Sequence, residues 1–111
     1  MYDNWTTEQK FAVLRILMDI AVANNFLDVS EMNFILETSE DFGLHRNVVL
    51  SILQTTPVRK ALPHLSKMEE HEKIEVANLM RSLIDIDGQV DKNEVKIFTV
   101  VMNEMGFEIS G

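Results

Sequence analysis

The chain has 111 residues, of which 46% are hydrophobic and 25% are charged, and this is the size and composition of one soluble globular domain. Ten basic and eighteen acidic residues give a formal net charge of -8, so the surface repels nucleic-acid phosphates and anionic lipids. The lack of cysteine excludes disulfides, thiolate metal sites and cysteine nucleophiles. No apolar run approaches the roughly 18 residues of a membrane span, and no secretory signal pattern is present. We therefore expect a cytoplasmic protein that neither inserts into membranes nor binds nucleic acid.

The first predicted element is a helix over about residues 7–24. Its apolar residues recur with a helical period and cover much of the circumference, which is typical of a helix buried in the core. Thr6 and Gln9 have the spacing of a capping box. In this motif the threonine hydroxyl accepts a hydrogen bond from one free backbone N–H, and the glutamine side-chain amide accepts a hydrogen bond from another. This pattern places the start of the helix directly after Thr6.

Two further helices are predicted before Pro57. The first spans about residues 29–42 and ends at Gly43, a residue type suited to the left-handed conformation that follows many helices. The second begins at Leu44 and carries an apolar stripe with helical spacing. It ends before Pro57, because proline cannot continue a helix and restrains the residue that precedes it.

Residues 57–66 are predicted to be a linker with a short helical turn that is broken near Pro63. Ser66 and Glu69 repeat the capping-box spacing and predict the start of a long helix. Its apolar period places Ile74, Ala77, Met80 and Ile84 on one face of the helix.

The last predicted helix runs from about Lys92 to Met105 and ends at Gly106. No stretch of the chain alternates between apolar and polar residues as a β-strand does. The predicted fold class is therefore all-α, with residues 1–111 forming a single helical bundle.

The two halves of the chain repeat one pattern at an offset of 63 residues. The offset superposes residues 5–44 on residues 68–107 and aligns three residue types: Asp28 with Asp91, Glu31 with Glu94, and Gly43 with Gly106. We therefore predict two related helical hairpins, joined by the third helix and the linker. Because each hairpin alone would expose an apolar face, the simplest arrangement packs the two face to face with approximate two-fold symmetry.

The stretch IDIDGQVDKNE, residues 84–94, gathers carboxylates around one glycine. In an EF-hand loop of roughly 12 residues, oxygen ligands surround a glycine at the sixth position and end with a bidentate glutamate. With Gly88 at the sixth position, four acids fall on ligand positions: Asp85, Asp87, Asp91 and Glu94. The first position is then Leu83, which cannot bind calcium, so a standard EF-hand is not expected. A degenerate EF-hand-like calcium sensor is the alternative hypothesis.

The acids shared by the two repeats also predict helix starts. Asp28 and Asp91 each stand at a position where the carboxylate accepts backbone N–H groups two or three residues further on. Glu31 and Glu94 follow in the first turn, where the helix dipole favours negative charge. Each cap is expected to contribute about 1 kcal/mol.

The turn of each hairpin carries a short acidic motif, AVANNFLDVSE in the first repeat and IDIDGQVDKNE in the second. Two helical hairpins with an A-x-A-D-G-x-I-D-x-x-E type of turn resemble the TerB-like domains of tellurite-resistance proteins. They also resemble the N-terminal cytoplasmic domain of the DjlA co-chaperone. The resemblance spans about residues 5–107 and implies an all-α, non-enzymatic module of bacterial stress-response or membrane-linked assemblies.

The resemblance further implies that the acidic positions bind a divalent cation, calcium or magnesium, weakly. The ligands that it implies in the second repeat are Asp87, Asp91 and Glu94, with Asp85 nearby. A weaker set is implied in the first repeat: Asn24, Asp28 and Glu31. Asn24 and Asn25 stand where the motif has Asp and Gly, so the first site has one charge fewer.

No sequence motif for catalysis or for phosphate binding is present, so we expect no enzyme, and acid–base catalysis by the clustered carboxylates is only a third hypothesis. The seven methionines fall mostly on apolar stripes, where they fill the core. A methionine-lined groove between the hairpins would admit a partner helix. A protein partner is expected, and a homodimer is compatible with the pattern.

Overall fold

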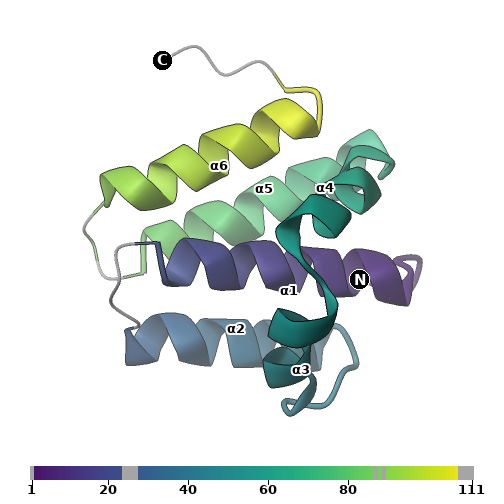
Figure 1. The fold of residues 1–111 in the computed structure, drawn as a ribbon, viewed down its shortest axis with the longest axis horizontal. Helices are drawn as coiled ribbons and strands as arrows, with labels where there is room; N and C mark the ends of the chain where they lie inside the picture. The colour runs from purple at the N-terminus through teal and green to yellow at the C-terminus, as the bar shows by residue number, and fades with distance from the viewer. Residues whose placement is uncertain (1, 24–27, 87, 89, 108–111) are drawn as a thin grey trace.

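Six helices and no strands make up the part of the chain that the computed structural model describes, residues 2–23, 28–86, 88 and 90–107 (Figure 1). In chain order the helices are α1 (Thr7–Ala21), α2 (Val29–Asp41), α3 (Val48–Thr55), α4 (Val58–Ser66), α5 (Glu70–Ile84) and α6 (Lys92–Glu104). The all-α fold class predicted from the apolar period is confirmed. None of these helices combines the length and the apolar character needed to cross a membrane.

Helix α1 is the centre of the fold, and it contacts all five other helices. Figure 1 shows α1 beside α5, with α2 and α6 on the outer sides of this pair. Eight of the fifteen residues of α1 are buried, on more than one face, as its broad apolar pattern predicts. The buried residues of α1 are Ala12, Val13, Leu14, Ile16, Leu17, Met18, Ile20 and Ala21.

The N-termini of α1 and α5 carry the same kind of cap. The Thr6 hydroxyl accepts from the Gln9 N–H at 3.0 Å, and the Thr6 N–H donates to Gln9 Oε1 at 3.0 Å, as predicted. At α5 the capping box is formed by Glu69 and Glu72, with the Glu69 N–H donating to Glu72 Oε1 at 2.9 Å. The predicted Ser66 cap is wrong, because Ser66 is the last residue of α4 and its hydroxyl donates to the Pro63 carbonyl.

Helix α4 continues through Pro63, where a break was predicted. Proline lacks the N–H that would bond to the previous turn, so the sequence alone favours an interruption. The helix persists because it packs against α1 and fully buries Ala61 and Leu65. Tertiary packing here outweighs the local cost of one missing backbone hydrogen bond.

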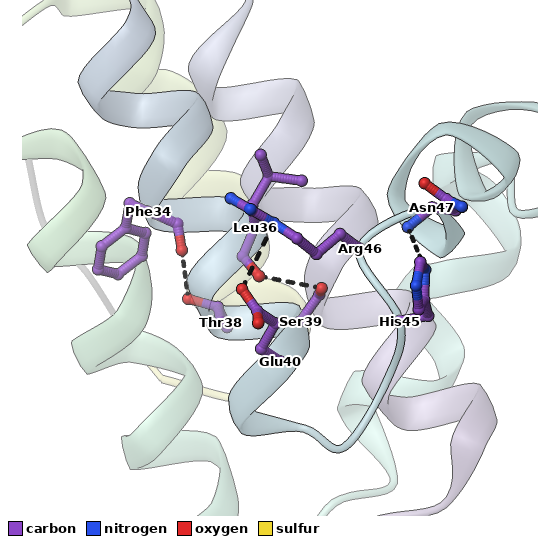
Figure 2. Close-up of polar contacts among 8 residues, drawn as sticks. All are labelled: Phe34, Leu36, Thr38, Ser39, Glu40, His45, Arg46 and Asn47. Carbon is purple, nitrogen blue, oxygen red and sulfur yellow. Dashed lines mark hydrogen bonds and ion pairs between the residues drawn. The ribbon is translucent and has the colours of Figure 1, made fainter.

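Helix α3 begins at Val48 rather than at the predicted Leu44, and a turn separates it from α2 (Figure 2). The His45 carbonyl accepts from the Val48 N–H at 3.0 Å, and His45 Nδ1 accepts from the Asn47 N–H at 3.2 Å. The Arg46 guanidinium lies 3.4 Å from the Glu40 carboxylate of α2. These contacts fix the direction in which α3 leaves α2.

The internal repeat is seen in the helix bounds. The bounds of α1, shifted by 63 residues, are those of α5, and the bounds of α2 become those of α6. Gly43 and Gly106 follow α2 and α6 with φ values of 80° and 95°, as predicted from their positions in the sequence.

The packing around the two repeats differs. Helices α2, α3 and α4 all contact α1, whereas α5 packs mainly against α1 and α6. The predicted face-to-face arrangement with two-fold symmetry is therefore not confirmed. Because α3 and α4 contact α1 but have no matching neighbours beside α5, the second repeat is left more open than the first.

Candidate functional site

Asp91 caps α6, as its position in the sequence predicts. Its Oδ1 accepts from the backbone N–H groups of Asn93 at 2.8 Å and Glu94 at 3.2 Å. Asp28 caps α2 in the same extended conformation, and its Oδ1 accepts from the Ser30 N–H at 2.7 Å. The interpretation of these two aspartates as helix caps is confirmed.

Glu31 and Glu94 are the third residues of α2 and α6, and both are buried, at 4% and 3% exposure. Each takes part in an interaction, so neither is a free residue. The positive end of the helix dipole favours a carboxylate in this position. Both repeats therefore place a buried glutamate in the first turn of a helix, and the helix dipole is a structural reason for its presence there.

Those predicted metal ligands of the second repeat that the structure describes lie at the two ends of the connection between α5 and α6. Asp85 is exposed at the C-terminus of α5, and Asp91 is partly buried across the turn at Gly88. Asp87 and Asn24 lie outside the described residues. Among the residues that are described, no three histidine or acidic side chains are close enough to share a metal ion. The divalent-cation site stays a prediction.

The residues that the structure describes give no support to an EF-hand loop in either repeat. The first ligand position falls on Leu83 in the second repeat and on Ile20 in the first. Both are fully buried within helices, α5 and α1. Five hollows are well formed over the described residues, and Asp85, Asp91 and Glu94 do not line any of the five.

The roomiest of these hollows is a groove of about 410 Å³ along α5 and α6, which we call the α5–α6 groove. Its lining is mostly apolar and consists of Ile74, Ala77, Asn78, Arg81, Phe98, Met102 and Phe107. Ile74 shares its predicted apolar face with the buried Met80 and Ile84, yet 47% of its own surface is exposed. Arg81 is exposed and makes no ion pair with any other described residue.

The sequence predicted a methionine-lined groove between the two hairpins. The α5–α6 groove differs from this prediction in its position and in its lining. It lies within the second repeat, and Met102 is its one methionine. The signal that could have located it is the repeat itself: Leu14 and Met18 of α1 correspond to Ala77 and Arg81 of α5. A smaller and a charged residue there indicate a face that the described part of the chain leaves open.

A second hollow of about 210 Å³ lies between α1, α4 and α6. Asp19 of α1 and Lys96 of α6 both line it, and the rest of its lining is aliphatic. Burial raises the pKa of Asp19 above its ordinary 3.8, while Arg15, 3.4 Å away, acts in the opposite direction. Arg15 also donates to the Leu53 carbonyl of α3 at 3.1 Å, so this residue joins α1 to α3.

No protein-family model matches the sequence, and no curated protein matches it. The fold is similar to the crystal structure of a protein of unknown function from Porphyromonas gingivalis W83. The two share 18% sequence identity with a TM-score of 0.74, and the match covers 96% of this chain and 83% of the other. This similarity shows that the helical arrangement recurs in a second protein, and it carries information on the fold alone.

Proposed function

We propose that the protein is a non-enzymatic helical module that binds a protein partner through the α5–α6 groove. The observation that carries the proposal is the apolar lining of the groove, in which Phe98 and Met102 are only partly buried and Ile74 is exposed. Its volume lies within the range of about 300–1,000 Å³ that is common for binding pockets. Burying such side chains against a partner is favourable at about 25 cal/mol per Å² of apolar surface.

The charge of the chain supports a protein partner rather than a nucleic acid, because a net charge of -8 repels phosphates. The resemblance to TerB-like domains supports a role without catalysis, in a bacterial stress-response context. An apolar groove with one exposed arginine at its edge fits a protein surface that is apolar at its centre and polar or acidic at its border.

The proposal is tested by selecting binders from an unbiased library of displayed peptides. Peptides that recognise the groove should lose at least about tenfold in affinity on Ile74→Asp, since a charge would then face the apolar lining. The matched control is Val100→Asp, which places the same charge on an exposed valine of α6 outside the groove. If no recovered peptide distinguishes the two variants, the proposed function is wrong.

We also propose, from the same resemblance, that the turn between α5 and α6 binds a divalent cation weakly. Gly88, with φ of 75°, lies in the turn between the exposed Asp85 and the partly buried Asp91. Calorimetric titration with calcium, magnesium and manganese should give heat on the wild type. Asp91→Asn should bind less, because it keeps an oxygen for the cap but loses the charge. The absence of heat at millimolar ion would exclude this role.

A further inference from the structure

The two repeats differ in what covers equivalent surfaces. In the first repeat, α3 packs against both α1 and α2, and Val49 and Ile52 of α3 are buried there (Figure 1). In the second repeat, the equivalent surface of α5 and α6 is the α5–α6 groove. No helix follows α6 among the described residues, whereas α3 follows α2 in the first repeat.

Equivalent residues confirm that the groove is the uncovered counterpart of the α3 site. Met18 and Ile35 in the first repeat are buried, at 4% and 0% exposure, and both lie beside Leu53 of α3. Their counterparts are Arg81, which is exposed, and Phe98, which is only partly buried. The groove is therefore formed by the equivalent pair of helices, α5 and α6, and among the described residues no counterpart of α3 covers it.

The first repeat also shows how one end of the covering helix is held. Arg15 of α1 donates to the carbonyl of Leu53, in the last turn of α3, where the helix dipole is negative. The counterpart of Arg15 is Asn78, and Arg81 lies one turn further along α5. Both line the groove and both carry N–H donors.

We propose that the α5–α6 groove binds one short amphipathic helix of a partner protein, in the way that α3 covers α1 and α2. The partner helix carries an aliphatic stripe, spaced as Val49 and Ile52 are in α3, and this stripe packs against Phe98 and Met102. The negative C-terminal end of the helix meets Arg81 and Asn78. This inference rests on the proposed function and adds the class of partner and its orientation.

Charge complementarity favours this occupant. Arg81 makes no ion pair with the other described residues, and it is an exposed cation in the mostly apolar lining of the groove, on a strongly acidic chain. A helix C-terminus, or an acidic residue close to it, provides the negative charge that such an arginine binds. A second copy of the chain would instead bring a surface of the same net negative charge.

The probe is a peptide of residues 45–56 of this chain, labelled with fluorescein and stapled between positions 50 and 54. Leu50 and Gln54 are exposed in α3, so the staple fixes the helix without touching its buried face. Fluorescence anisotropy should show saturable binding to the wild type. Ile74→Asp and Arg81→Glu should each weaken binding, the first by at least about tenfold.

Two controls match these variants. Val100→Asp should leave peptide binding unchanged, and a peptide with Ile52→Asp, which places a charge on the buried stripe, should not bind. Circular dichroism of each variant verifies that it is folded. Because Ile74 and Arg81 are both exposed, at least one of the two groove variants is expected to fold normally.

The outcomes separate this inference from the proposed function. If the stapled peptide fails to bind at millimolar concentration while displayed peptides still bind in the groove, the partner is not a helix and only the inference is overturned. If neither binds, both are overturned. If the wild type sediments as a dimer that Ile74→Asp dissociates, a second copy fills the groove and the inference of a separate partner is wrong.

Discussion

Asp28 and Asp91 are 63 residues apart and occupy the same position at the start of α2 and α6. Both have an extended backbone, with φ and ψ of -77° and 139° at Asp28 and of -88° and 135° at Asp91. Oδ1 of each accepts from the N–H two residues further on, at 2.7 and 2.8 Å. The two repeats therefore share an aspartate cap at the start of the second helix of each hairpin. This cap does not depend on what either turn binds.

Replacing either aspartate with alanine is expected to destabilise the protein, because backbone N–H groups at the helix start lose their partner. We expect about 1 kcal/mol for Asp28→Ala and somewhat more for Asp91→Ala, whose carboxylate also accepts from Glu94 at 3.2 Å. Urea unfolding measures both. Asn at either position should recover most of the loss, since it can still accept the hydrogen bond. A cost that Asn fails to recover would contradict the role as a cap.

The helix starts and ends were predictable where short-range patterns determine them. The cap at Thr6, the two aspartate caps and the glycines after α2 and α6 each depend on residues within one turn. The start of α5 was not predictable in this way, because Ser66 and Glu69 are each followed three residues later by a glutamate. In the structure Ser66 ends α4, and Glu69 forms the capping box of α5. Competition between neighbouring signals is decided by tertiary structure, which the sequence pattern does not contain.

Gly43→Ala and Gly106→Ala are expected to cost about 1 to 2 kcal/mol each, because both glycines have positive φ values that disfavour a Cβ atom. A Cβ at either position would meet no atom within 4 Å, so the cost comes from backbone strain and not from a clash. Thermal or urea unfolding would measure it. Asn, which tolerates the left-handed region, should cost less than Ala at both positions. Equal costs for Ala and Asn would exclude this explanation.

The candidate site was less predictable than the fold. A pattern of apolar residues shows that a helix face is buried or available for burial, but not which neighbour covers it. Ile74 illustrates this, since it fits the inward stripe of α5 and yet lines an open groove. The acids of the α5–α6 turn illustrate the converse, because Asp91 and Glu94 are already engaged at the helix start.

Pro63→Ala is expected to raise the free energy of unfolding by roughly 1 to 3 kcal/mol. Alanine restores an N–H to the middle of α4 and removes the steric conflict of the ring with the previous turn. The greater freedom of alanine in the unfolded chain opposes this by up to about 1 kcal/mol. The side chain at position 63 is exposed, so no core contact is lost. Urea unfolding measures the change, and a decrease in stability would show that the proline supports α4.

Asp19→Asn is expected to change how stability depends on pH. Burial raises the pKa of Asp19 above its ordinary 3.8, so the folded state holds the proton more tightly than the unfolded state. This contribution to stability is fully present below pH 3.8 and is lost as the pH rises through the folded-state pKa. The wild type should therefore lose stability relative to Asp19→Asn as the pH rises from the acid range toward neutrality.

Thermal unfolding of both proteins across this pH range measures the difference in Tm. Arg15 lowers the pKa of Asp19 and is the residue that limits the effect, since its guanidinium lies 3.4 Å from the carboxylate. Adding Arg15→Met should therefore enlarge the pH dependence, because burial would then act without its opposing charge. Glu37→Gln, which removes an exposed charge from α2, controls for the change in net charge. A Tm difference between wild type and Asp19→Asn that is constant with pH would show that Asp19 titrates alike in both states, and that the hollow beside α4 and α6 leaves it well solvated.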